Sequence, residues 1–175
     1  MSRMKRDKLL IAAKILVIFL KVVLGIAALG VTVAIPVVIF SQSHVAEALA
    51  AGFSLGAGLS LVVVTMLLGL AMLAAAFWFV HLLGRMIDTV GEGDPFVPVN
   101  ADRLARMGWI AAGLQVAQIP LTALASILGQ YFPEANIDID SGVSLTGVAL
   151  AIVLFILARV FREGAAMRED LEGTV

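Results

Sequence analysis

Cysteine is absent from this 175-residue chain, and charged side chains are scarce. Without cysteine there is no disulfide, no thiolate nucleophile and no cysteine-ligated zinc. Only 14% of the residues are charged and 61% are hydrophobic, whereas soluble domains have about 25% charged and about 45–50% apolar residues. A soluble fold of this size could not cover its surface with so few polar side chains. The composition therefore predicts an integral membrane protein.

Residues that carry catalysis are also sparse. The two histidines, His44 and His81, lie on different segments, so no pair of imidazoles stands at metal-ligand spacing. The middles of the apolar segments contain no Asp or Glu, which leaves proton relays and ion-coupled transport without a carboxylate at bilayer depth. No nucleophile–base pair, zinc motif or carboxylate pair stands there either. We therefore expect a protein that is not an enzyme and that binds no cofactor and no metal.

Long apolar runs dominate what is present. They place membrane-spanning helices at about 14–40, 57–83, 107–128 and 143–161, each near the roughly 20 residues that cross about 30 Å of hydrocarbon. Within hydrocarbon the backbone must satisfy its own hydrogen bonds, so these runs are helices. The first run is about twice as long as the 7–15 apolar residues of a signal peptide, and we expect it to be retained. The predicted fold is an all-α, integral membrane four-helix bundle forming one domain over 1–175.

Within the first run, three lysines at near-helical spacing qualify the span. Lys8, Lys14 and Lys21 recur every six or seven residues, close to two helical turns. We expect residues 4–20 to lie partly in the membrane interface, with the lysines reaching the headgroups.

Positive charge is segregated along the chain. All twelve Lys and Arg residues lie before residue 22, in the central segment 84–106, or from Arg159 onward. The other two connections, 41–54 and 129–142, contain Glu47, Glu134, Asp138 and Asp140 but no basic residue. The positive-inside rule therefore places both termini, the central loop 84–106 and the tail 162–175 in the cytoplasm.

The segment GEGDPFVPVNADRLARMGW, residues 91–109, interrupts the apolar pattern. Gly91 and Gly93 are predicted to end the preceding helix, because glycine readily adopts the left-handed conformation common there. Asn100 is predicted to be the N-cap of the next helix, with Asp102 favourably placed in its first turn. The segment is thus expected to be a capped turn between two spans.

Two chemical alternatives for this segment are disfavoured. GEGD lacks the GK[ST] ending of a phosphate-binding loop. The acids Asp88, Glu92, Asp94 and Asp102 match no EF-hand register. What turn formation leaves unexplained is Pro95-Phe96 together with Arg103 and Arg106.

The tail FREGAAMREDLEGTV is predicted to continue the fourth span as a short polar helix. It is too short to fold alone, so we expect it to pack under the bundle, with Arg162 facing the loop acids. The candidate cytoplasmic partner surface therefore combines loop and tail residues: Asp94, Pro95, Phe96, Asn100, Arg103, Arg106, Arg162 and Glu163.

A second candidate site lies inside the third span. Gln115, Gln118 and Thr122 share one helix face, and Pro120 frees a backbone carbonyl nearby. Such a face either bonds to a neighbouring helix or lines a polar pocket. The second alternative would suit a small oligomeric transporter or channel.

The loop GDPFVPVNADRLARMGW and the tail FREGAAMREDLEGTV resemble the bacterial membrane family called domain of unknown function 2975. The resemblance extends over the whole chain. The positions that carry it are Gly93, Pro95, Phe96, Asn100, Arg103, Leu104, Gly108, Arg162, Glu163, Gly164, Thr174 and Val175.

The resemblance implies a multi-pass protein of the bacterial cytoplasmic (inner) membrane, and it brings no established activity. Family members are often encoded beside a small helix-turn-helix regulator, which implies a regulatory partner by association alone. We expect a non-enzymatic interaction or regulatory protein that contacts the lipid bilayer, with self-association as a further partner interaction. Direct nucleic-acid binding is not expected. The small transporter or channel is the alternative.

Overall fold

The computed structural model describes residues 2–41, 55–131 and 143–172. Over these residues the chain forms four helices and no strand: α1 (Ser2–Phe40), α3 (Leu55–Gly91), α4 (Pro98–Tyr131) and α5 (Leu145–Glu172). All four are long and apolar enough to cross a membrane, which confirms the predicted all-α, multi-pass fold. His44 and the acids of the two charge-poor connections, Glu47, Glu134, Asp138 and Asp140, lie outside the described residues, as do Thr174 and Val175.

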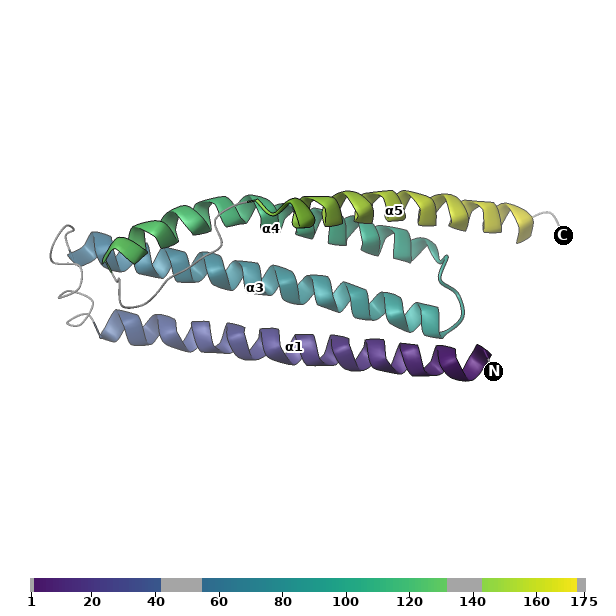
Figure 1. The fold of residues 1–175 in the computed structure, drawn as a ribbon, viewed down its shortest axis with the longest axis horizontal. Coiled ribbons are helices and arrows are strands. Elements are labelled where there is room, and N and C mark those ends of the chain that lie inside the picture. Colours follow the sequence, from purple (N-terminus) through teal and green to yellow (C-terminus); the bar gives the residue numbers. More distant parts are fainter. Residues whose placement is uncertain (1, 42–54, 132–142, 173–175) are drawn as a thin grey trace.

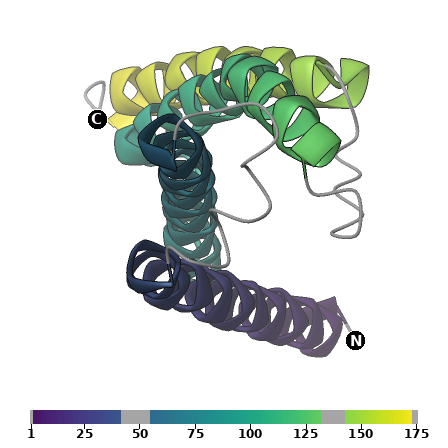
Figure 2. The same cartoon turned by 90° about the vertical axis from the view of Figure 1, so that its left-hand side faces the viewer.

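The helices pack in the order in which they occur in the chain. The extensive contacts among the described residues join α1 to α3, α3 to α4 and α4 to α5. Figure 2 shows α1 on one side of α3 and the α4–α5 pair on the other. Successive helices run in opposite directions, so the start of α1, the α3–α4 turn and the end of α5 lie at one end of the molecule (Figure 1). This end, called here the charged end, is the one toward which the basic residues fall.

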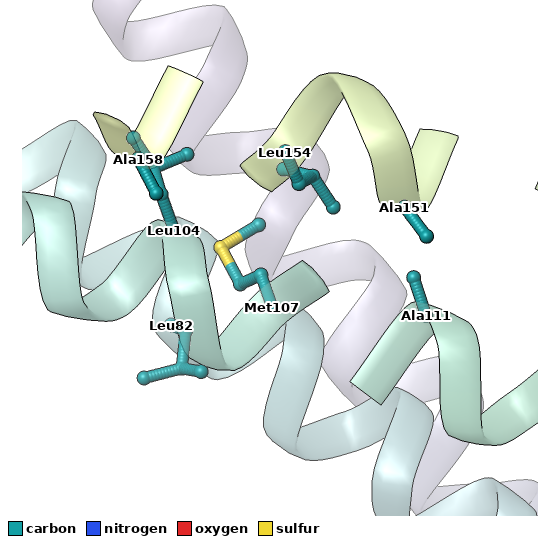
Figure 3. Packing of buried hydrophobic residues seen from close by; sticks show 7 residues of the cluster. All are labelled: Leu82, Leu104, Met107, Ala111, Ala151, Leu154 and Ala158. Carbon is teal, nitrogen blue, oxygen red and sulfur yellow. The ribbon is translucent and has the colours of Figure 1, made fainter. Parts of the chain in front are cut away.

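The buried core lies where α3, α4 and α5 meet. Leu82, Leu104, Met107 and Leu154 form it together with small residues on the α4–α5 contact (Figure 3). These small residues let the two helices approach closely, which is how membrane helices gain packing energy. At Gly108 an added Cβ would lie 3.0 Å from Phe155 Cε1. The small residues of the cluster are Ala111, Ala151 and Ala158.

Helix α1 packs against α3 along one face. Val17 is buried, and a Cβ added at Gly84 of α3 would lie 3.0 Å from Val17 Cγ1. Many of the other large side chains of α1, among them Ile15, Phe19 and Ile26, are exposed. In a membrane these exposed apolar side chains face the hydrocarbon, where their burial within the protein is not needed.

Candidate functional site at the charged end of the helices

The end of α3 is a glycine-dependent helix stop. The N–H of Asp94 donates to the carbonyl of Thr89 at 3.3 Å, and the N–H of Gly93 donates to that of Val90 at 3.2 Å. These two bonds form a Schellman motif, whose C′ residue has a left-handed backbone. Gly93 has φ of +95°, so it performs the predicted helix-ending role. Gly91 is the last residue of α3.

The chain between α3 and α4 is shorter than the predicted loop 84–106, because both helices continue past the predicted span boundaries. Only residues 92–97 lie between the two helices. Pro98 is the first residue of α4, a position where proline is well tolerated because that N–H has no helical partner. The turn is therefore tight, and the arginines of this region lie on helices.

Asn100 organises this turn from inside. It is fully buried, and its amide nitrogen donates to Thr89 Oγ1 at 2.8 Å and to the Pro95 carbonyl at 2.9 Å. Its amide oxygen accepts a hydrogen bond from Arg103 Nη1 at 2.9 Å. One side chain thus joins the end of α3, the turn and the second turn of α4.

Two sequence predictions about this region are wrong. Asn100 is not an N-cap, because α4 already begins at Pro98 and the amide of Asn100 bonds to α3 and the turn. For the same reason Asp102 lies beyond the first turn of α4. Its carboxylate instead pairs with Arg162 of α5 at 3.5 Å.

The tail packs against this turn as expected. Helix α5 continues without a break to Glu172, and its Arg162 lies beside Asp102. One helical turn and a half further on, Arg168 pairs with Asp94 of the turn. Each ion pair is partly solvent-exposed, and such pairs contribute about 0–1 kcal/mol apiece. The ion pairs therefore orient the tail but add little to the free energy of folding.

Aromatic packing supplies the apolar part of the same contact. The rings of Phe96 in the turn and Phe161 in α5 lie 5.2 Å apart between centroids. A Cβ added at Gly164 would lie 2.9 Å from Phe96 Cδ1. We call the residues that join turn and tail the loop–tail junction: Asp94, Phe96, Asp102, Phe161, Arg162, Gly164 and Arg168.

The eight residues predicted as a partner surface divide into several environments. Asn100 is internal, so it cannot contact a partner directly. Phe96 remains 41% exposed, and Arg106 is exposed. Arg103 is held by Asn100 and by the carbonyl of Arg85. The remaining four lie in or beside the loop–tail junction: Asp94, Pro95, Arg162 and Glu163, of which Glu163 pairs with Arg159.

The arginines of α3 and α4 line a groove between the two helices. Its volume is about 430 Å³, and it is lined by Trp78, His81, Leu82, Arg85, Val99, Asp102, Arg103 and Arg106. Trp78 stacks on His81 with centroids 5.4 Å apart. The sequence predicted that Arg103 and Arg106 lie together. It did not predict that Arg85, Trp78 and His81 lie beside them. We call this feature the arginine groove.

A second groove separates α1 from the α3–α4 turn. Its volume is about 730 Å³, with Lys14, Asp88 and Glu92 among its lining residues. Lys14 pairs with Asp88 at 2.9 Å, so this lysine contacts α3, whereas the sequence predicted that it reaches the headgroups. Three of the four acids considered as metal ligands are thus engaged separately: Asp88 by Lys14, Asp94 by Arg168 and Asp102 by Arg162.

The polar face inside α4 has one clear structural role. Gln115 Oε1 accepts a hydrogen bond from the N–H of Ser144 at 2.9 Å. Ser144 precedes α5, and its hydroxyl accepts from the N–H of Gly147 at 3.4 Å. Helix α5 therefore starts beside the middle of α4, and Gln115 satisfies the backbone donor of the residue that precedes α5.

The other two residues of that face have no such role within the described part of the chain. Gln118 Oε1 and Thr122 Oγ1 are buried and accept or donate no hydrogen bond to described residues. The transport alternative, which depended on all three side chains, stays a prediction. Gln115 instead accepts a hydrogen bond at the N-terminal end of α5.

A family model described as "Protein of unknown function (DUF2975)" matches residues 58–175. The chain belongs to this family. The match begins within α3, so α1 lies outside it, whereas the resemblance drawn from the sequence covered the whole chain. The DUF2975 match includes the α3–α4 turn, the loop–tail junction and the arginine groove. Neither a curated protein nor a solved structure matches the chain.

Proposed function

We propose that this DUF2975 protein is a non-enzymatic interaction protein of the bacterial inner membrane that offers the loop–tail junction to a protein partner in the cytoplasm. The proposed orientation has both termini inside. Its support is that the basic residues gather toward the end of the molecule that carries the 92–97 turn. Cytoplasmic flanks of membrane helices have this excess of Lys and Arg.

The observation that carries the proposal is the fixed position of the tail. The Arg168–Asp94 ion pair and the Phe96–Phe161 contact hold the end of α5 against the turn, and the Arg162–Asp102 pair holds it against the start of α4. A tail that only terminated a membrane helix would not need these specific contacts. The arrangement yields one continuous surface from two distant parts of the sequence.

Exposed apolar side chains on this charged surface add to the argument. Phe96 in the α3–α4 turn is 41% exposed, and Met167 near the end of α5 is 63% exposed. Both lie in segments that are otherwise rich in polar residues. Aromatic residues and methionine are enriched in protein interfaces relative to other surfaces. An aromatic anchor already positioned by its neighbours also loses little side-chain entropy on binding.

The partner proposed is the small helix-turn-helix regulator that the family association implies. If it docks here, membrane fractions should contain the regulator when the protein is expressed and lose it when the protein is absent. A regulator that stays in the soluble fraction in both cases would remove this partner from the proposal.

In-cell photo-cross-linking tests the surface itself. A photoreactive amino acid at Met167 is expected to give a discrete cross-linked protein. The control is Leu67, an apolar position on α3 that is 50% exposed and is expected to face lipid. Identical cross-link patterns from the two positions would contradict a partner at the loop–tail junction.

A further inference from the structure

The arginine groove concentrates positive charge at one level of the molecule. Arg85 of α3 and Arg103 and Arg106 of α4 line it, together with the single acid Asp102. The carboxylate of Asp102 is already engaged by Arg162 of α5. The groove therefore has an excess of positive charge that its own acid does not neutralise.

Two of the three guanidinium groups are available. Among the described residues, the side chains of Arg85 and Arg106 are exposed and form no hydrogen bond or ion pair. Arg103 is different, because its Nη1 donates to the Arg85 carbonyl at 3.1 Å and to Asn100 Oδ1. Arg103 thus provides a fixed edge of the groove, and Arg85 and Arg106 can turn toward an anion without breaking a hydrogen bond or an ion pair. Arg85 also interacts electrostatically with Asp88, beside which it lines the neighbouring groove.

Away from Arg85, the α3 side of the groove is lined by aromatic and apolar side chains. Trp78 is 52% exposed and lies about two helical turns from Arg85 on α3, or about 10 Å along the helix axis. Tryptophan favours the membrane interface, where the indole ring meets both the headgroup region and hydrocarbon. Leu82 of the core lines the groove between Trp78 and Arg85.

We propose that the arginine groove binds an anionic phospholipid, with the phosphate group at Arg85, Arg103 and Arg106 and the glycerol and upper acyl chains along Trp78. Basic pockets between membrane helices recognise acidic lipid headgroups in this way. The guanidinium group suits the task, because it presents several donors in a plane to phosphate oxygens. This inference is independent of a protein partner at the loop–tail junction.

Fluorescence quenching of Trp78 by brominated lipid tests the proposal in bilayers. The chain has two tryptophans, so Trp109→Phe leaves Trp78 as the sole tryptophan, which excitation at long wavelength selects over tyrosine. Brominated phosphatidylglycerol is expected to quench Trp78 at several-fold lower mole fraction than brominated phosphatidylcholine. Equal quenching by the two lipids would overturn the proposal, and this comparison needs no change in the groove.

Charge-removing variants then identify the binding residues. Arg85→Gln and Arg106→Gln, in the Trp109→Phe background, should each lower the preference for the anionic lipid by about fivefold. Arg159→Gln is the matched control. Arg159 lies at a similar level, between the Gly108–Phe155 and Asp102–Arg162 contacts, but outside the groove and paired with Glu163. A loss of preference in the control as large as in the groove variants would contradict the assignment.

Competition by soluble phosphate distinguishes a lipid headgroup from a free phosphate as the ligand. Inorganic phosphate or glycerol phosphate at millimolar concentration should leave the quenching by brominated phosphatidylglycerol unchanged, because neither has an acyl chain to lie along Trp78. Displacement of the lipid by either anion would show that a soluble phosphate is the ligand and would overturn the lipid assignment.

Discussion

Gly164 of α5 lies so close to Phe96 of the α3–α4 turn that a Cβ atom at position 164 would stand 2.9 Å from Phe96 Cδ1. The absence of a side chain at one point of the tail thus determines how closely the tail can approach the turn. Phe161, one turn earlier on α5, completes the contact with a ring 5.2 Å from that of Phe96. The loop–tail junction is therefore a packed contact with ion pairs at its edges.

Replacing Gly164 should separate the tail from the turn. Gly164→Leu is expected to cost about 1–3 kcal/mol of packing free energy, because the added atoms overlap the Phe96 ring. Hydrogen exchange of the amides of residues 159–170 should accelerate, while exchange in α3 stays unchanged. Ala166→Leu, at an exposed position of the same tail, is the control, and Phe96→Ala should restore protection in the Gly164→Leu background. Equal protection in both leucine variants would contradict the contact.

Asn100 should be among the most sensitive positions outside the spans. Asn100→Ala removes the hydrogen bonds of a fully buried side chain to Thr89, to the Pro95 carbonyl and to Arg103. The free energy of unfolding is expected to fall by about 2–4 kcal/mol. The exposed neighbour Val99→Ala should change it by less than about 0.5 kcal/mol.

A double-mutant cycle checks the route of that effect. If Asn100 acts through the Thr89 hydroxyl, then Thr89→Val should cost little in the Asn100→Ala background, although it destabilises the wild-type protein. Additive losses would show that the two side chains act separately. Denaturant unfolding in detergent micelles gives the required free energies.

Gln115 should affect the start of α5. Gln115→Leu leaves the Ser144 N–H without its acceptor, so local opening should become easier by about 1–3 kcal/mol. Hydrogen exchange at residues 144–148 reports this opening. Val116→Leu, on the exposed side of the same helix turn, should leave exchange unchanged.

The same face offers a clean test of the transport alternative. Because Gln115 caps α5, its loss would disturb folding, so Gln118→Leu and Thr122→Val are the better variants. Solute flux in reconstituted liposomes that falls in these two variants, with folding intact, would favour transport over interaction.

The spans, the helix stop at Gly93 and the contact of Arg162 with a loop acid could be predicted from the sequence, because each follows from local chemistry or charge. Hydrophobic length gives the spans, and only glycine suits the backbone at Gly93. The role of Asn100 could not be predicted. Its position resembles an N-cap, and its true partners become visible only when the end of α3 is placed beside α4.

The arginine groove escaped prediction for a related reason. Helical spacing grouped Arg103 with Arg106. Arg85 lies beside them only because of the way α3 and α4 are oriented in their packing. The Lys14–Asp88 pair likewise depends on the register of α1 along α3. Interhelical register is fixed by side-chain packing, which periodicity within one helix does not specify.

Reporter fusions test the orientation of the molecule. A periplasm-active reporter fused after Gly93 is expected to be silent, because the positive-inside rule places the α3–α4 turn in the cytoplasm. A fusion after Glu47, between the first two spans, should be active. Activity after Gly93 would reverse the orientation and remove the cytoplasmic partner.

Cysteine cross-linking in native membranes tests most directly whether the start of α4 and the tail form one cytoplasmic surface. The chain has no cysteine of its own, so the pair Asp102→Cys and Arg162→Cys provides the only thiols. A short bifunctional thiol reagent should join this pair, whereas Asp102→Cys with Leu150→Cys, about 18 Å further along α5, should not react. We predict that an impermeant maleimide blocks the cross-link in inside-out vesicles and leaves it intact in right-side-out vesicles. Absence of the cross-link, or blocking only in right-side-out vesicles, would contradict the account.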